Sequence, residues 1–317
     1  MMILPGKEPD LKIGFTTFSY LFSPQNTENL EKVNNFKPDS SDNPEKLRAL
    51  SGISFKESKF FDHQGLIFLH VLKGLLSKVQ VNKTHSPLYL SVGPARTELE
   101  TLISWAERIS ESELSGEKLY PAVQPASAIG LLPNSALSML SIQLKWHGEG
   151  NVFSGFSESG MAAIKSALEA LYLGTDSALV SASSYAENHF VQKVMKRGFY
   201  ESIIPPSPVG IAAHFTKDSS DLSLRGLISF PSSIEIDSAI EQCSKIWRIN
   251  QETFLKSLFL EDFFGKRQLS ETFGDLMCAG PLFVFSLAEK NFFGKGLIPV
   301  VFRDHFHNIS AFLLEVL

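Results

Sequence analysis

The chain has 317 residues, 44% of them hydrophobic and 20% charged, which is enough apolar sequence to bury a substantial core. A net charge of -5 without long blocks of one sign argues against a nucleic-acid partner. No stretch offers the ~20 apolar residues that span a bilayer, the N-terminus lacks a signal-peptide pattern, and the two cysteines are isolated, so we expect a cytoplasmic protein without a membrane anchor.

Helix and strand patterns alternate through the first two thirds of the chain. A short β-rich run at 12–18 comes first, and apolar residues then recur at helical spacing from Asp62 to Val79. The continuous apolar run at 88–93 predicts a core strand. Further helices are expected at 98–110, at 135–145 (ended by Gly148 and Gly150), at 160–172 and at 186–197, and further strands up to Phe156 and at 177–183.

The last third continues the alternation. Two strands, at 209–215 and 226–230, are expected to be neighbours, and a helix is expected at 234–249. The pattern then predicts a strand at 253–263, a helix at 273–290 and strands at 297–303 and 309–316. Alternating elements favour an α/β protein with a mainly parallel sheet covered on both faces, and their number fits an α/β/α/β/α layered arrangement.

The segment from Asn151 to Ala163, NVFSGFSESGMAA, carries the strongest indication of chemistry. A short apolar run turns sharply at Phe156-Ser157-Glu158 and enters a helix of small residues. A hydroxyl at such a turn lies at a helix N-terminus, where free N–H groups and the helix dipole favour a nucleophile or a bound oxyanion. Ser157 is therefore a candidate catalytic residue.

The flanks of this segment resemble a known family. The chain has Leu132-Pro-Asn-Ser-Ala136, then Gly148-Glu-Gly-Asn151, then Ser157-Glu-Ser-Gly160, and this run is similar to the nucleophile region of the β-ketoacyl synthases, enzymes of the thiolase fold. The resemblance implies two similar βαβαβ halves in one compact unit. Residues 1–220 would form the ketosynthase-like half, which contains the strand-to-helix turn at Phe156-Ser157-Glu158 (the elbow). Residues 221–317 would form a shortened second half. It implies no cofactor and no metal.

The chain departs from the family at three catalytic positions. Ser157 stands where the family has its cysteine, and Asp275 falls on a family histidine in the run from Gly274 to Gly280. The second family histidine would fall near 261–263, which contains none. A serine without an adjacent base is seldom nucleophilic near neutral pH, and losing members of a cooperative catalytic set costs orders of magnitude in rate. We therefore expect no condensation by this chain alone.

Other candidate residues each have a structural explanation. Ser157 can serve as the small residue that a crowded turn tolerates, and Glu158 can complement the helix dipole instead of acting as a base. His305 and His307, in the segment that resembles the family's closing glycine-rich loop, could reach the pocket or lie hydrogen-bonded at a strand end. Asp275 could make a polar contact in a collapsed pocket or be solvated.

Within this family, subunits that keep the fold but lose the nucleophile resemble chain-length factors. The resemblance thus implies a non-condensing partner of an active ketosynthase, working with an acyl carrier protein in type II polyketide, aryl-polyene or unusual fatty-acid synthesis. Pairing, with a ketosynthase or with a second copy, would extend one sheet through the strand at 177–183. Two alternatives remain open: an acyltransferase or esterase-like enzyme that uses Ser157 as acyl acceptor, and an acyl-carrier binding module.

Overall fold

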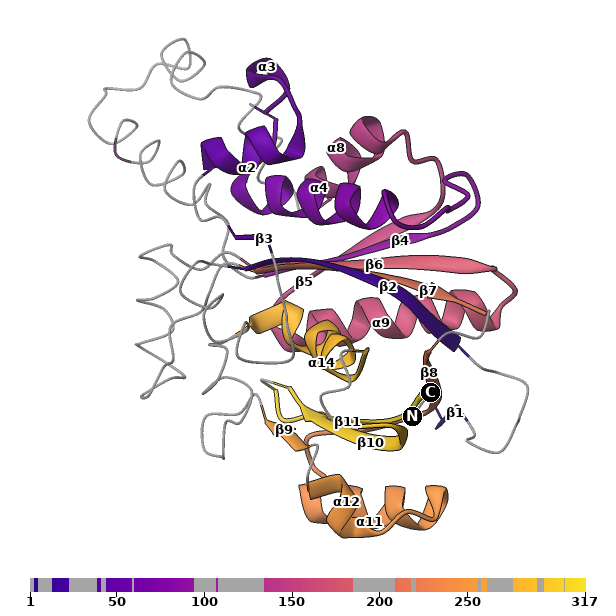
Figure 1. Ribbon diagram of the computed structural model, residues 1–317. Helices are drawn as coiled ribbons and strands as arrows, with labels where there is room; N and C mark the ends of the chain where they lie inside the picture. Colours follow the sequence, from indigo (N-terminus) through magenta and orange to yellow (C-terminus); the bar gives the residue numbers. More distant parts are fainter. Residues whose placement is uncertain are drawn as a thin grey trace.

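The two ends of the chain lie close together in the computed structural model (Figure 1). It describes residues 3–4, 13–22, 39–40, 44–58, 60–93, 107, 134–184, 209–217, 221–255, 258–260, 276–289, 294–304 and 306–317. The helices expected at 98–110 and 186–197 lie outside these residues, apart from residue 107. Within the described part, no helix is long and apolar enough to cross a membrane.

The first half of the chain builds one end of a mixed sheet. Its strands run in the spatial order β5-β4-β6-β7-β2. Here β4 is parallel to both β5 and β6, and β7 is antiparallel to both β6 and β2. The bounds of these strands are β2 (Ile13–Phe22), β4 (Leu88–Val92), β5 (Gly150–Ser154), β6 (Ser177–Ser184) and β7 (Val209–Thr216).

The second half repeats this arrangement with fewer strands. Its spatial order is β8-β11-β10-β9, with β9 parallel to β10, and β11 antiparallel to both β10 and β8. Strand β8 thus corresponds to β2, β11 to β7, β10 to β6 and β9 to β4. The bounds are β8 (Leu222–Phe230), β9 (Leu258–Leu260), β10 (Gly296–Arg303) and β11 (Ile309–Val316); the short β1 (Ile3–Leu4) and β3 (Asp39–Ser40) pair with β8 and β2.

The pairing of the strands corrects two predictions. Strand β2 pairs with β7 along most of its length and with β8 at residues 13–15, so β7 and β8 flank β2 and are not neighbours. The sheet is also not mainly parallel, because β7, β2, β8 and β11 run antiparallel to one another in that order. A hydrophobic pattern fixes which face of a strand is buried, whereas long-range pairing decides its neighbour and direction.

Helices complete five layers, which confirms the predicted α/β/α/β/α arrangement (Figure 1). Helices α2 (Pro44–Ser51), α4 (His63–Leu76) and α8 (Ser135–Leu144) cover the outer face of the first-half strands, and α3 (Phe55–Ser58) follows α2. Helices α9 (Ser157–Tyr172) and α14 (Gly280–Glu289) lie between the strands of the two halves, and α11 (Ile236–Trp247) and α12 (Gln251–Leu255) cover the other outer face.

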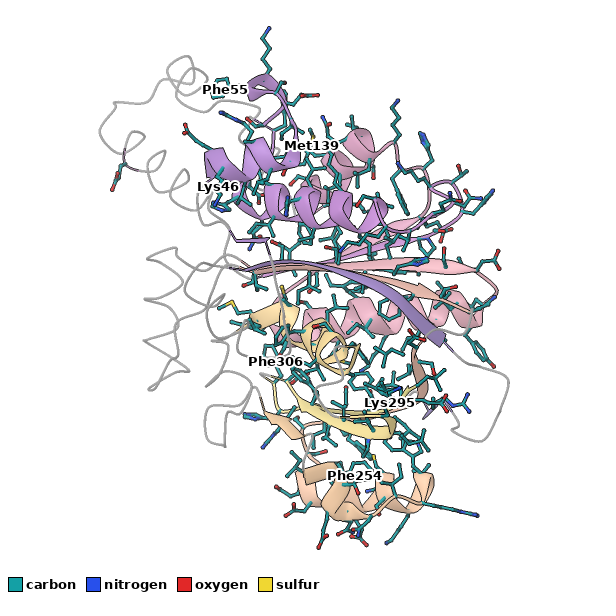
Figure 2. All side chains as sticks on the ribbon, viewed as in Figure 1. Lys46, Phe55, Met139, Phe254, Lys295 and Phe306 are labelled. Atoms are coloured by element: carbon teal, nitrogen blue, oxygen red, sulfur yellow. The ribbon has the colours of Figure 1, made fainter. Side chains whose placement is uncertain are left out.

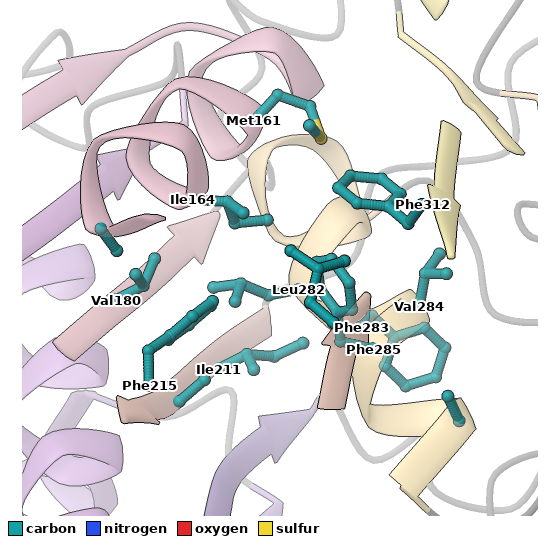
Figure 3. Close-up of a cluster of buried hydrophobic side chains, with 14 of the residues drawn as sticks. Met161, Ile164, Val180, Ile211, Phe215, Leu282, Phe283, Val284, Phe285 and Phe312 are labelled. Carbon is teal, nitrogen blue, oxygen red and sulfur yellow. The ribbon is translucent and has the colours of Figure 1, made fainter. Parts of the chain in front are cut away.

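The central layer explains why α14 is apolar on every side. Its sequence, GPLFVFSLAE, packs against α9, β7 and β11, so it has no solvent face to supply with polar residues. Phe285 of α14 meets Phe312 of β11 edge to face, with ring centroids 4.7 Å apart. Figure 3 shows this core, in which Met161 and Ile164 of α9 and Ile211 of β7 complete the cluster.

Two local predictions were also wrong. Helix α8 ends at Leu144 and is capped by Lys145, which adopts the left-handed conformation at φ 52° that glycine usually supplies; Gly148 and Gly150 do not end it. The run at 253–263 contains the end of helix α12 and the short strand β9 where one strand was expected. Phe254 of α12 stacks on Trp247 of α11, so tertiary packing overrides the β-like composition of this run.

Candidate functional site

The turn between β5 and α9 has the geometry expected of an elbow. Strand β5 ends at Ser154, two residues form the turn, and α9 begins at Ser157. Ser157 is fully buried, at 0% exposure, in the first turn of a 16-residue helix. The positive end of the helix dipole therefore acts on its hydroxyl, an arrangement that stabilises negative charge.

The Glu158 side chain hydrogen-bonds to the backbone of the same turn. Its Oε1 accepts the backbone N–H of Phe156, the N-cap residue of α9, at 2.8 Å. A Cβ at Gly155 would lie 2.1 Å from that Oε1, so the turn requires glycine as long as the cap is made. The Gly155 N–H bonds to the Val92 carbonyl at 3.0 Å. These contacts support a capping role for Glu158 over the alternative of a general base.

A short chain of hydroxyls fixes the elbow to the sheet beneath it. Ser159 Oγ donates to the Phe156 carbonyl at 2.7 Å and lies 2.7 Å from Ser91 Oγ on β4. A serine hydroxyl has one proton, so Ser91 is the donor in the second contact. Ser91 and Ser159 are both buried. The N-terminus of α9 is thus held against the carboxyl end of β4.

The second half contributes a thiol that the sequence analysis did not single out. Cys278 lies in the short 3-10 helix η1 (Met277–Ala279) ahead of α14, and its Sγ donates to the Ser183 carbonyl at 3.2 Å and lies 3.5 Å from the Ser91 carbonyl. Burial raises the pKa of this thiol to about 12. Cys278 is therefore held in its neutral thiol form.

The turn between β10 and β11 approaches the elbow from the second half. Phe306 meets Phe156 edge to face, with ring centroids 6.4 Å apart. Figure 2 shows Phe306 between the layer of α9 and α14 and the second-half strands. Asp304 is 4% exposed, and its carboxylate accepts hydrogen bonds within this turn, one from Phe306 and three from Asn308. His307, in the same turn, is half-buried and has a backbone φ of 64°.

Several predicted site residues lie outside the described part of the chain. These are Asp275, the segment 261–263 and His305. Of the other candidates, the structure brings Ser157 and Glu158 together with the turn that contains His307. Sequence periodicity gave no reason to connect Cys278 or Asp304 to this site, because both come from the other half. Among the described residues, no group of three or more His, Cys, Asp or Glu could hold a metal ion.

No family model matches the sequence, and no curated protein matches it. Solved structures do match. The first is a type II polyketide synthase acyl-carrier protein in complex with its ketosynthase bound to the hexaketide, at 11% identity and TM-score 0.70 over 97% of this chain and 100% of that one. The chain has the thiolase fold of the ketosynthases. This confirms the fold that the elbow motif implied.

Two further ketosynthase-fold structures cover almost the whole chain. The ishigamide ketosynthase/chain length factor matches at 12% identity and TM-score 0.67, over 96% of this chain and 99% of that one. A ketosynthase in complex with its chain length factor from Xenorhabdus doucetiae matches at 12% identity and TM-score 0.54, with the same two coverages. At these identities, the likeness is one of fold.

Proposed function

We propose that this chain is a non-condensing ketosynthase-like subunit of chain-length-factor type. It would pair with an active ketosynthase in type II polyketide, aryl-polyene or unusual fatty-acid biosynthesis. The observation that carries the proposal is an elbow kept in full with a hydroxyl in place of the thiol. Glu158, Ser159 and Ser91 still hold the turn, but Ser157 has no thiol to ionise.

The buried thiol of Cys278 strengthens this argument. Decarboxylating condensation needs a thiolate to accept the acyl group. Cys278 lies across from α9, but burial keeps it protonated far above neutral pH, and its proton is engaged with the Ser183 carbonyl. Two solved structures with this fold are described as a ketosynthase with a chain length factor, which gives the proposed role a precedent.

The edge of the first-half sheet offers a surface for pairing. The strand expected to pair, at 177–183, is β6, and it is bordered by β4 and β7, so it cannot add another strand. That expectation was wrong. Among the residues that the structure describes, strand β5, directly before the elbow, is the terminal strand of the sheet order and pairs only with β4. An open edge can extend the sheet across a two-fold axis.

The test is to express the chain together with an active ketosynthase and an acyl carrier protein. We expect co-purification as a 1:1 pair and condensation of malonyl-carrier by the pair only. Condensation by the lone chain would overturn the proposal, and so would a ketosynthase that makes the same products without it.

A second candidate function rests on the position of Ser157 at the N-terminus of α9, which suits an oxyanion. In that case Ser157 would accept an acyl group as an ester, making the chain an acyltransferase or esterase. Intact-mass spectrometry after incubation with acyl thioesters tests it. An adduct on the wild type that is lost in Ser157→Ala would favour this function. A carrier-binding module alone would retain a carrier in pull-down without changing any product.

A further inference from the structure

Three large apolar side chains lie exposed together on the outer face of the first half. Phe55, at the start of α3, is 64% exposed; Phe60 follows α3, and Ile142 lies on α8. Arg48 of α2 lies over the Phe55 ring, 5.2 Å from its centroid, and the exposed Lys56 follows Phe55 in the chain. We call these five residues the basic-apolar patch. Single exposed apolar residues are ordinary, but a cluster of them marks an interaction site.

A capping box holds the turn that presents Phe55. Helix α3 has only four residues, too few to be stable by itself. The Ser54 N–H donates to Glu57 Oε2 at 2.8 Å, and the Glu57 N–H donates to Ser54 Oγ at 3.3 Å. Glu57 Oε1 accepts Gln143 Nε2 of α8 at 3.2 Å, and the Glu57 carbonyl accepts the Phe60 N–H at 3.1 Å. Glu57 therefore fixes α3 against α8 with Phe55 in solvent.

The charge around the patch is positive, although the net charge of the whole chain is -5. Helices α2 and α3 carry the cations Lys46, Arg48 and Lys56 and the carboxylates Glu45 and Glu57. Lys73 of α4 adds a cation beside α2, because its Nζ donates to the Ser51 carbonyl. This face of the molecule therefore attracts an anionic surface.

The opposite outer face has an excess of negative charge. The segment that contains α11 and α12 carries four carboxylates and two cations, which are Glu235, Asp237, Glu241, Glu252, Lys245 and Arg248. Lys245 is already paired with Glu241. Figure 2 shows Phe55 and Phe254 of α12 on opposite sides of the molecule. An anionic surface would therefore orient the protein with α2 and α3 toward it and α11 away from it.

A lipid surface fits the basic-apolar patch better than a second copy of the chain does. Two copies joined through this face would bring cations against cations. Figure 1 shows α3 projecting beyond α2 on this outer face, so Phe55 is carried by a protrusion and not by a groove. An apolar side chain that enters the headgroup region, flanked by cations that meet lipid phosphates, is typical of peripheral membrane binding. Such binding needs no spanning helix.

We propose that the basic-apolar patch docks the protein reversibly on an anionic lipid surface, with Phe55 inserted among the headgroups. Phe60 and Ile142 widen the apolar contact, and Arg48 and Lys56 meet the phosphates. The inference goes beyond the proposed function, because it concerns where the protein works and holds whether or not the chain pairs with a ketosynthase.

Co-sedimentation with vesicles tests the proposal. The full chain is mixed with vesicles of phosphatidylcholine alone or of phosphatidylcholine with phosphatidylglycerol. Phe55→Ser and Lys56→Gln remove one apolar and one cationic member of the patch. Ile246→Ser and Lys245→Gln are the matched controls on the opposite face, where both residues are exposed. Urea unfolding of each variant checks that the exposed substitutions leave the fold intact.

We expect binding to the anionic vesicles that rising salt weakens, and little binding to phosphatidylcholine alone. Phe55→Ser should weaken it at least ~5-fold and Lys56→Gln about 3- to 5-fold, whereas both controls should bind like the wild type. Absence of binding to anionic vesicles would overturn the proposal, and so would equal losses in patch and control variants. Retention of an acidic protein by the patch without vesicle binding would assign the surface to a protein partner and also overturn it.

A fluorescent reporter separates insertion from simple charge attraction. The indole introduced by Phe55→Trp should shift its emission to shorter wavelength on anionic vesicles and be quenched by lipids with brominated acyl chains. Ile246→Trp should show neither change. Vesicle binding without quenching at position 55 would overturn the insertion of this residue.

Discussion

The backbone of Cys278 lies directly against Gly160 of helix α9. A Cβ built on Gly160 would be 2.1 Å from the Cys278 carbonyl oxygen and 3.2 Å from Pro281 Cγ. Cys278 belongs to the second half and Gly160 to the first, one turn after Ser157. Glycine at this position lets the two central helices approach so closely. The small-residue pattern SESGMAA after the elbow thus serves the contact between the halves.

Gly160→Ala should therefore destabilise the protein by about 1–3 kcal/mol, the usual cost of overpacking a core. At an exposed helix position, a Gly→Ala change would raise the free energy of unfolding by up to about 1 kcal/mol. The sign of the measured change therefore distinguishes a crowded position from an exposed one. Urea unfolding measures the difference. Ser166→Ala, at a half-buried position of the same helix, should change the free energy of unfolding by about 0.5 kcal/mol or less. Equal effects of the two variants would contradict the close contact.

The hydroxyls of Ser91 and Ser159 should contribute unequally. Ser159→Ala leaves the Ser91 proton buried without its acceptor and also removes the bond to the Phe156 carbonyl. Ser91→Ala leaves that second bond in place. We expect Ser159→Ala to cost about 1–3 kcal/mol of unfolding free energy and Ser91→Ala to cost less. The double variant should show a coupling of about 0.5–1.5 kcal/mol, and additive single effects would contradict the predicted donor order.

The buried thiol of Cys278 should make stability fall at high pH. Its pKa is about 12 in the folded protein against an ordinary value of 9.0. Between these values the unfolded chain loses the proton first, so rising pH favours unfolding, by up to about 1.4 kcal/mol per pH unit for one thiol. Lys165, whose pKa is lowered, contributes the opposite slope.

Comparing the wild type with Cys278→Ala isolates this effect. The unfolding free energy of the wild type should drop more between pH 9 and 10.5 than that of the variant, while the two slopes should agree below pH 8. Cys243→Ala, which removes the other thiol with a pKa of about 12, provides the matched comparison. Identical slopes in all three proteins would show that Cys278 ionises freely in the folded state.

The elements and the elbow could be predicted because their signals are local. Apolar spacing located α4, α9 and α11, and the turn at Phe156-Ser157-Glu158 is encoded by adjacent residues. The order of the strands could not be predicted in this way. Strand β2 separates β7 from β8 although it precedes both by about two hundred residues in the chain, and period-2 patterns carry no information on such pairing.

Local sequence patterns also could not predict which residues of the other half lie near the elbow. Cys278 lies against Gly160 of α9, and the turn that contains Asp304 contacts Phe156 through Phe306; both come from the other half, more than a hundred residues away along the chain. Knowledge that the two halves repeat the same strand order would have pointed to these residues. If α14 corresponds to α9, then η1 corresponds to the elbow and must face it across the central layer. Without the strand order, a lone cysteine in an apolar run indicates only burial.

The open edge of β5 gives the last prediction. The Leu88 N–H donates to the Glu149 carbonyl, and the Gly155 N–H donates to the Val92 carbonyl. The backbone N–H and C=O groups of alternate residues along β5 therefore point toward β4, and those of Val152 point away from it. The Val152 N–H donates to Oδ1 of the preceding Asn151 at 2.8 Å. In a two-fold pairing of β5 with the same strand of another copy, centred on Val152, the two Val152 residues would exchange N–H···O bonds, and Asn151 would have to release its bond.

Asn151→Ala should therefore strengthen association through β5 by several-fold, since it frees the outward donor at a cost of about one exposed hydrogen bond. Val152→Pro removes that donor and should weaken association by more than ~10-fold. Analytical ultracentrifugation of the chain, alone and mixed with an active ketosynthase, measures both effects. Ile142→Ser, on exposed α8 outside the strand, is the surface control. Pairing that Val152→Pro leaves intact would mean that another surface joins the subunits.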